Sequence, residues 1–136
     1  MERKRAGCQM EARQTDIGRQ AVQISNALTR NHREHFGRGA GSVKTIINRG
    51  FVITFLEEIY TPLERTMIEG GRPDLVHEAR LAFQLMMRDT YVAIVEEATG
   101  RKVRAFMSQN HIGPDIAVEI FVLESEAGET SDVQPQ

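Results

Sequence analysis

Apolar residues near the start of the chain recur at spacings of four, three and four positions, which is the period of one helix stripe. The pattern predicts a helix from Thr15 to Phe36 that ends at Gly37. The stripe is as narrow as the seam of a helix pair, so we expect it to pack against a second copy. The residues of this expected oligomer interface are Ile17, Ala21, Ile24 and Leu28.

Two stretches of alternating residues predict β-hairpins. The first joins Val43–Asn48 to Phe51–Leu56 through a turn containing Gly50, and the second joins Lys102–Ser108 to Asp115–Leu123. Both alternating sets of Phe51–Leu56 are largely apolar, so we expect both faces of that strand to be covered. On the last strand one clean apolar row stands out: Ile116, Val118, Ile120 and Val122.

Two helices are predicted between the hairpins. The first begins after Thr61 with Pro62, and Glu64 completes a capping box by reaching back to the Thr61 amide. It runs to about Glu69. The second is expected to continue from Pro73 to Ala98, with Gly100 as its left-handed C-cap. Its expected buried face consists of Leu75, Val76, Ala79, Phe83, Met86, Met87, Ile94, Val95 and Ala98.

The predicted order is α-β-β-α-α-β-β, which indicates an α+β fold with a four-stranded, mainly antiparallel sheet and helices on at least one face. We expect a single domain over residues 15–124. Residues 1–14 and 125–136 are polar and contain little to bury, so we expect a disordered leader and a disordered acidic tail.

Composition places the chain among ordinary globular proteins. It has 136 residues, 40% hydrophobic and 26% charged, and no apolar run approaches the roughly 20 residues of a membrane-spanning helix. No apolar segment follows the basic start, so we expect a cytoplasmic protein without direct membrane insertion. Cys8 is the only cysteine, which excludes an internal disulfide.

The charges are distributed unevenly along the chain. Residues 1–50 carry ten Lys/Arg and four acids, whereas residues 51–136 carry seven and fifteen. This asymmetry suits an anionic partner or head-to-tail contact between copies, and the alternative is a solvated basic helix and acidic tail.

A glycine-rich loop after the first helix is the candidate small-ligand site. Free backbone amides beside cations could bind phosphate, bicarbonate or a carboxylate. The loop lacks the Lys-Ser ending of a nucleotide P-loop and follows a helix rather than a strand, so a plain connection remains the alternative. The residues of this expected anion site are Gly37, Arg38, Gly39, Ala40, Gly41, Ser42 and Lys44.

Other constellations predict no catalytic, metal or cofactor site. His32 and His35 lack converging ligands and are expected to be solvated, as are the acidic pairs at 57–58 and 96–97. Arg101, Lys102 and Arg104 with Phe106 have the composition of a nucleic-acid contact. The acidic pI of about 6.1 argues against nucleic acid as a partner. We therefore expect no enzyme activity.

Four motifs in order resemble the MpsC-like family of small bacterial domains. The resemblance covers about Thr15–Glu124, with Ala40 where similar proteins usually carry proline. The motifs are Phe36-Gly37-Arg38-Gly39 with Ser42-Val43, Tyr60-Thr61-Pro62-Leu63-Glu64, Thr99-Gly100-Arg101-Lys102-Val103 with Phe106-Met107-Ser108, and the strand Asp115–Leu123.

The resemblance implies a link to a sodium-translocating, membrane-potential-generating system associated with uptake of inorganic carbon, and it supplies no catalytic residues. We therefore expect a non-enzymatic accessory protein that acts by protein–protein contact. A homo-oligomer and membrane transporter subunits are the expected partners. The alternative is an anion- or nucleic-acid-binding regulatory domain that uses the basic first half.

Overall fold

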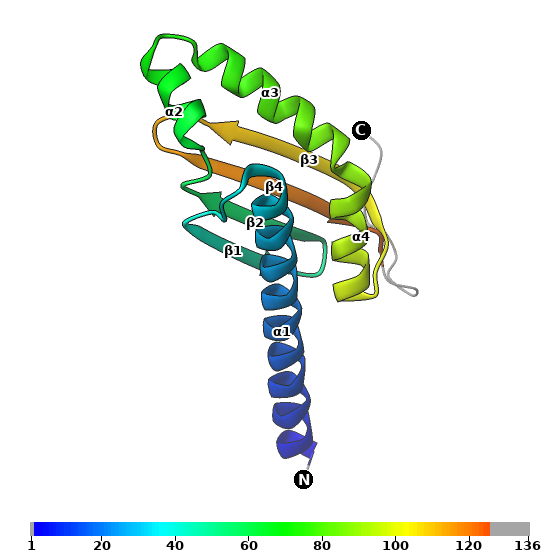
Figure 1. The fold of residues 1–136 in the computed structure, drawn as a ribbon. Helices are drawn as coiled ribbons and strands as arrows, with labels where there is room; N and C mark the ends of the chain where they lie inside the picture. Colours follow the sequence, from blue (N-terminus) through cyan, green and yellow to red (C-terminus); the bar gives the residue numbers. More distant parts are fainter. Residues whose placement is uncertain (1, 126–136) are drawn as a thin grey trace, which may run out of the picture.

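The computed structural model describes residues 2–125, with side chains placed from residue 13 onward. The expected α+β class and element order are confirmed, except that the long second helix is divided in two (Figure 1). The elements are α1 Glu2–Phe36, β1 Ser42–Ile47, β2 Phe51–Glu57, α2 Pro62–Glu69, α3 Pro73–Met86, α4 Arg88–Thr99, β3 Val103–His111 and β4 Ile116–Leu123.

The four strands form one antiparallel sheet in the order β1-β2-β4-β3. Each hairpin forms as the sequence predicts, and the pairing of β2 with β4 joins the two hairpins at the centre. The helices α1, α3 and α4 pack on one face of this sheet, which gives the molecule two layers (Figure 1).

The first helix is longer than expected, because α1 begins at Glu2 rather than Thr15. Residues 2–14 are rich in Glu, Arg, Gln and Ala, which have high helix propensity, and this segment continues the helix where a disordered leader was expected. In Figure 1 the N-terminal turns of α1 project beyond the edge of the sheet. Of the tail expected over residues 125–136, residues 126–136 lie outside the described part of the chain.

The core takes up two of the four residues that were expected at an oligomer interface on α1. Ile24 and Leu28 are buried against α4 and the sheet, in a cluster with Val52, Val95 and Phe121. They are therefore unavailable to a second copy, because α4 and the sheet already cover them. Ile17 is 40% exposed and Ala21 is half-buried, so only this end of the stripe remains accessible.

The long helix expected from Pro73 to Ala98 bends at Met87, which has φ −87° and ψ −2°. No proline or glycine lies at this point. The bend lets α3 lie against α2 and β3 while α4 packs against α1 and β3. Tertiary packing, rather than local sequence, therefore divides the helix.

The buried face of α3 also differs from the expected one. Its buried positions are Val76, Arg80 and Gln84, whereas Leu75 and Met86 are exposed, Met86 at 76%. The apolar pattern failed here because α3 covers polar partners on α2 and β4, so the residues that complement them are polar.

The start of α2 is capped as the sequence predicts. The Thr61 side chain accepts a hydrogen bond from the Glu64 amide at 3.2 Å, and Glu64 Oε1 accepts from the Thr61 amide at 2.9 Å. Both bonds satisfy amides that the helix itself leaves without a partner.

Thr61→Ala is expected to lower the free energy of unfolding by about 1 kcal/mol, because the side-chain acceptor of the cap is lost. Urea denaturation would measure the change. Thr66→Ala is the matched control on the same helix, since the Thr66 hydroxyl donates only to the Pro62 carbonyl within it and is exposed. Equal stability of wild type and Thr61→Ala would contradict the capping role.

Candidate functional site

A buried ion pair lies between α1, α2 and α3. Arg80 of α3 is 3% exposed, and its Nε and Nη2 donate to the two carboxylate oxygens of Glu64, the first at 2.6 Å. Nη2 also donates to the Ile59 carbonyl at 2.8 Å, and the guanidinium carbon lies 3.7 Å from the centre of the Phe36 ring. Arg80 therefore ties α1 and α2 to α3 through one side chain.

The Glu64 carboxylate is held in its charged form by this pairing. Burial raises the pKa of Glu64, but the hydrogen bonds from Arg80 and Thr61 together bring it below its ordinary value. The same carboxylate thus serves both the cap of α2 and the ion pair with α3.

His32 of α1 completes the cluster in its neutral form. Its Nε2 lies 3.1 Å from Arg80 Nη1 and its Nδ1 lies 2.8 Å from the Arg38 carbonyl. Because the guanidinium only donates, Nε2 accepts and Nδ1–H donates to the carbonyl. Burial lowers the pKa of His32, in agreement with this tautomer. The expectation that His32 is solvated is wrong, whereas His35 is exposed as expected.

A second buried acid, Glu119 of β4, faces the helices. Glu119 is 4% exposed, and Gln84 Nε2 lies 3.5 Å from its Oε1. Burial raises the pKa of Glu119 to about 8, although the Ser108 hydroxyl opposes the shift. At neutral pH this carboxyl is therefore protonated. Sequence reasoning missed it, although Glu119 alternates with Ala117 and Phe121, which are both in the core.

These polar side chains enclose too little space for a substrate. A cavity of about 20 Å³ lies between His32, Arg80, Gln84 and Glu119, which is room for about one water molecule. In the part of the chain that the structure describes, no group of three or more His, Cys, Asp or Glu could hold a metal ion. We interpret the buried cluster as the link between helices and sheet.

The glycine-rich loop makes several hydrogen bonds within the fold. The Gly41 amide donates to the Glu57 carbonyl at 2.9 Å, and Arg38 donates to the carbonyls of Tyr60 and Glu58. The Glu58 side chain lies directly against Gly41, which leaves no room for a Cβ and adds negative charge.

Lys44 does not join the loop. It lies on the other face of the sheet, since its neighbour Thr45 bonds Ser25 of α1. The loop residues Gly37 to Ser42 therefore lie together, but the structure does not bring them into the expected anion site with Lys44.

The basic stretch after α4 is also engaged internally. Phe106 packs in the core, with its ring centroid 5.2 Å from that of Phe121 and 6.3 Å from that of Tyr91. Arg101 donates to the carbonyls of Arg49 and Glu124. The ring is therefore unavailable for stacking on bases, which removes the main support for nucleic-acid contact.

A groove of about 570 Å³ lies between α1 and the β1–β2 turn. Arg13 and Arg49 line it, but so do Asp16 and the apolar Ile17 and Ile47. Arg101 also lines it, so the groove combines cationic, acidic and apolar side chains, a mixture that does not single out one class of ligand.

The face of the sheet opposite the helices is uncovered and largely apolar. The expectation that both faces of β2 are covered is wrong: Val52, Thr54 and Leu56 are buried, but Phe51 and Phe55 are 37% and 40% exposed. The apolar row of β4 lies on this same uncovered side. We call the surface the open face and define it by Ile46, Phe51, Ile53, Phe55, Met107, Val118, Ile120 and Val122.

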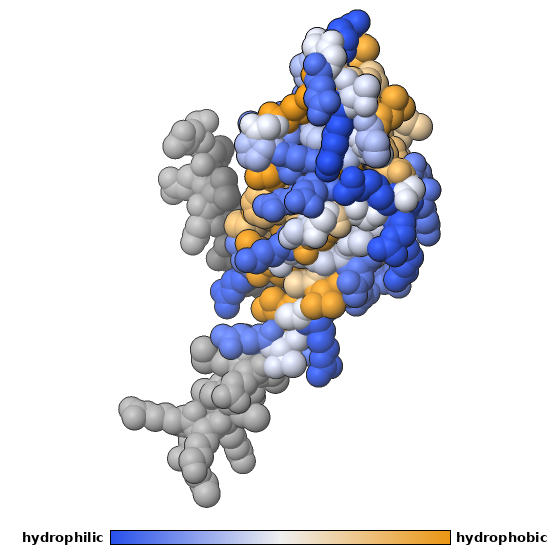
Figure 2. Space-filling view, turned by 60° about the vertical axis from the view of Figure 1, so that its left-hand side comes forward, coloured by the Kyte–Doolittle hydropathy of each residue, from blue (hydrophilic) through white to orange (hydrophobic). Residues whose placement is uncertain are grey.

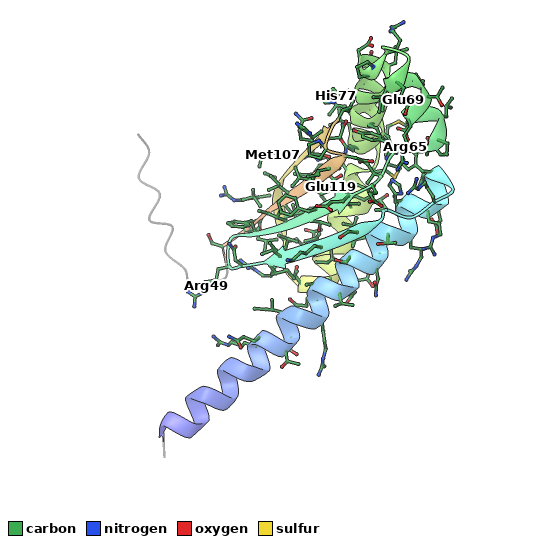
Figure 3. All side chains as sticks on the ribbon, turned by 90° about the vertical axis from the view of Figure 1, so that its left-hand side faces the viewer. Arg49, Arg65, Glu69, His77, Met107 and Glu119 are labelled. Atoms are coloured by element: carbon green, nitrogen blue, oxygen red, sulfur yellow. The ribbon has the colours of Figure 1, made fainter. Side chains whose placement is uncertain are left out.

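Strand register arranges the open face into rows. The central row crosses all four strands as Ile46, Ile53, Ile120 and Met107, which are neighbours in successive strand pairs. Figure 3 shows Met107 on the side of the sheet away from α1. Figure 2, which views the domain from the side, shows hydrophobic residues interspersed with hydrophilic ones on the visible surface. The row at one end of the face holds the polar residues Ser42, Glu57 and His111 together with Ile116.

The fold and its surfaces thus define a two-layer α+β domain with a closed polar interior and one uncovered apolar sheet face. The chain belongs to the MpsC family: the family model described as Na+-translocating membrane potential-generating system (MpsC) matches residues 17–125. The resemblance noted from the sequence motifs is therefore confirmed. No curated protein and no solved structure gives a significant match. Among the described residues, no helix combines the length and hydrophobicity needed to cross a bilayer.

Proposed function

We propose that this domain is a non-enzymatic accessory component of a sodium-translocating, membrane-potential-generating system, and that it acts by protein–protein contact through the open face. The family supports the link to the system. The closed interior supports contact rather than catalysis, because Glu119 and His32 face a cavity of only about 20 Å³. The system's role in inorganic-carbon uptake and a cytoplasmic location belong to the same proposal.

The observation that carries the proposal is the extent of the open face. Four strands spaced about 4.8 Å apart span about 19 Å, and seven residues of β2 extend about 24 Å, which gives about 450 Å². The largest apolar patch of a typical monomer is about 300–600 Å² and often marks an interaction site, and the open face, its polar positions included, is of this size. An apolar centre with polar residues at its rim is also the usual anatomy of a protein interface.

Ile120→Lys is expected to abolish the contribution of this protein to membrane potential, because a charge then lies at the centre of the contact surface. The variant would replace the wild-type gene in the host, and a potential-sensitive dye and growth under limiting inorganic carbon would be measured.

Leu85→Lys is the control, since Leu85 is an equally large side chain, 63% exposed on α3. Circular dichroism of the purified variants would verify that both fold. A folded Ile120→Lys protein that sustains the wild-type potential would refute the proposed role of the open face.

A further inference from the structure

We propose that the partner on the open face is a second copy of this chain, packed sheet against sheet in a two-fold symmetric dimer. The inference rests on the proposed function, since it names the occupant of the same surface. It replaces the contact first expected through α1, where Ile24 and Leu28 are already buried.

The width of the open face favours a second sheet over a single helix. The face is about 19 Å wide, whereas a helix with its side chains has a diameter of about 10–12 Å. One helix would leave two strands uncovered. A second four-stranded sheet has the same width, and two sheets pack face to face at about 10 Å with their strand directions within about 30° of each other.

The two-fold axis that fits the side chains best runs parallel to the strands, between β2 and β4. Large side chains of one copy then face smaller ones of the other. Rotation about this axis places each β2 residue over the residue that pairs with it on β4, now in the second copy. Phe55 then faces Val118 and Phe51 faces Val122. An aromatic ring thus opposes a smaller β-branched side chain on both sides of the central row, which favours interdigitation.

The charges are compatible with the same arrangement. Lys44 shares a row with Phe55, Val118 and Gln109, so that it faces Gln109 of the second copy. Glu57 shares the end row with Ile116 and therefore faces an uncharged residue. No two like charges of the open face oppose one another, which is the requirement for an interface that contacts itself.

The area indicates a reversible dimer. Two facing surfaces of about 450 Å² each bury about 900 Å² if both are treated as flat. This value is just below the limit of about 1,000 Å² for a specific interface. We therefore expect the purified protein to be a concentration-dependent dimer.

Two exposed methionines provide a matched pair for the test. Met107 is 51% exposed on the open face, and Met86 is 76% exposed on α3. Light scattering and sedimentation over a concentration series should give a dimer for wild type and for Met86→Lys. Met107→Lys should weaken the dimer about ten-fold or more, and the more central Ile120→Lys should be monomeric. A wild-type monomer at all concentrations, or a dimer unaffected by both open-face variants, would overturn the proposal.

Cross-linking tests the direction of the axis in a Cys8→Ser background. A short bis-maleimide should join Ile46→Cys in one copy to Met107→Cys in another when the two proteins are mixed. Ile46→Cys alone should remain uncross-linked, because the axis places the two β1 strands at opposite edges. Self-cross-linking of Ile46→Cys without the mixed product would overturn this arrangement.

The outcomes also separate the inference from the proposed function. A monomeric wild type whose Ile120→Lys variant loses activity in cells would reject the second copy but leave the open face as the contact surface for another protein. A dimer that Ile120→Lys dissociates, with full activity in cells, would uphold the inference and reject the proposed function.

Discussion

Arg80→Met is expected to lower the free energy of unfolding by about 3–5 kcal/mol, the cost typical of removing one partner from a buried ion pair. The substitution leaves the Glu64 carboxylate with a side chain only 14% exposed and without its guanidinium partner. It also removes the donor to Ile59 and the contact with Phe36. Methionine keeps much of the volume, so the loss reports mainly on the charge and the hydrogen bonds.

A double variant separates the cost of the unpaired charge from the cost of lost packing. Arg80→Met combined with Glu64→Gln should recover part of the lost stability, because glutamine removes the unpaired charge but keeps an oxygen for the cap of α2. Arg72→Met is the control, since the Arg72–Asp74 pair is more than half exposed and such pairs contribute little. Denaturation by urea would compare all four proteins. A change below about 1 kcal/mol in Arg80→Met would show that the buried pair does not hold the helices together.

Glu119→Gln is expected to make the protein more stable than wild type at alkaline pH. The pKa of Glu119 is raised from 4.5 to about 8 in the folded chain. The folded state therefore binds one proton more than the unfolded state between these values, and stability falls as pH rises through this window. The stabilisation that the raised pKa of Glu119 gives to the folded state is fully present below pH 4.5 and is lost above about pH 8.

The wild type should lose about 2 kcal/mol between about pH 6.5 and pH 8.5 from this group, whereas Glu119→Gln should lose little. The pKa of His32 is shifted the other way, below 6.5, so its effect lies mainly below this window and is shared by both proteins. Urea denaturation at a series of pH values would give the two curves. Parallel curves would contradict a protonated Glu119.

Local sequence signals predicted the start of α2, the end of α4 and both hairpins correctly. At these places a particular residue type sets the hydrogen bonding or the conformation of the neighbouring backbone. The capping box of Thr61 and Glu64 set the start of α2, and Gly100, with φ 69°, ends α4 as a left-handed cap. Both hairpins formed as expected because alternation and turn residues act over a few positions. The family that the motifs indicated was likewise confirmed by the family match.

The candidate sites were harder to predict from the sequence. An apolar stripe shows which residues prefer to be buried, but not which part of the molecule buries them. The stripe on α1 was expected to meet a second copy, yet α4 and the sheet bury Ile24 and Leu28. The row from Ile116 to Val122 was the clearest apolar pattern in the chain, yet it faces away from the helices. Burial instead follows Ala117, Glu119 and Phe121 on the alternate positions.

The sequence by itself determined the element order, the caps, the hairpins and the family, since these depend on neighbours along the chain. Only the tertiary structure decided which sheet face the helices cover, where the long helix bends, and that Arg80, Glu64 and His32 meet. These three residues come from three helices far apart in sequence, and no local pattern records their approach. Helices on one side of the sheet leave its other side apolar and uncovered, which is why the open face became visible only in the folded chain.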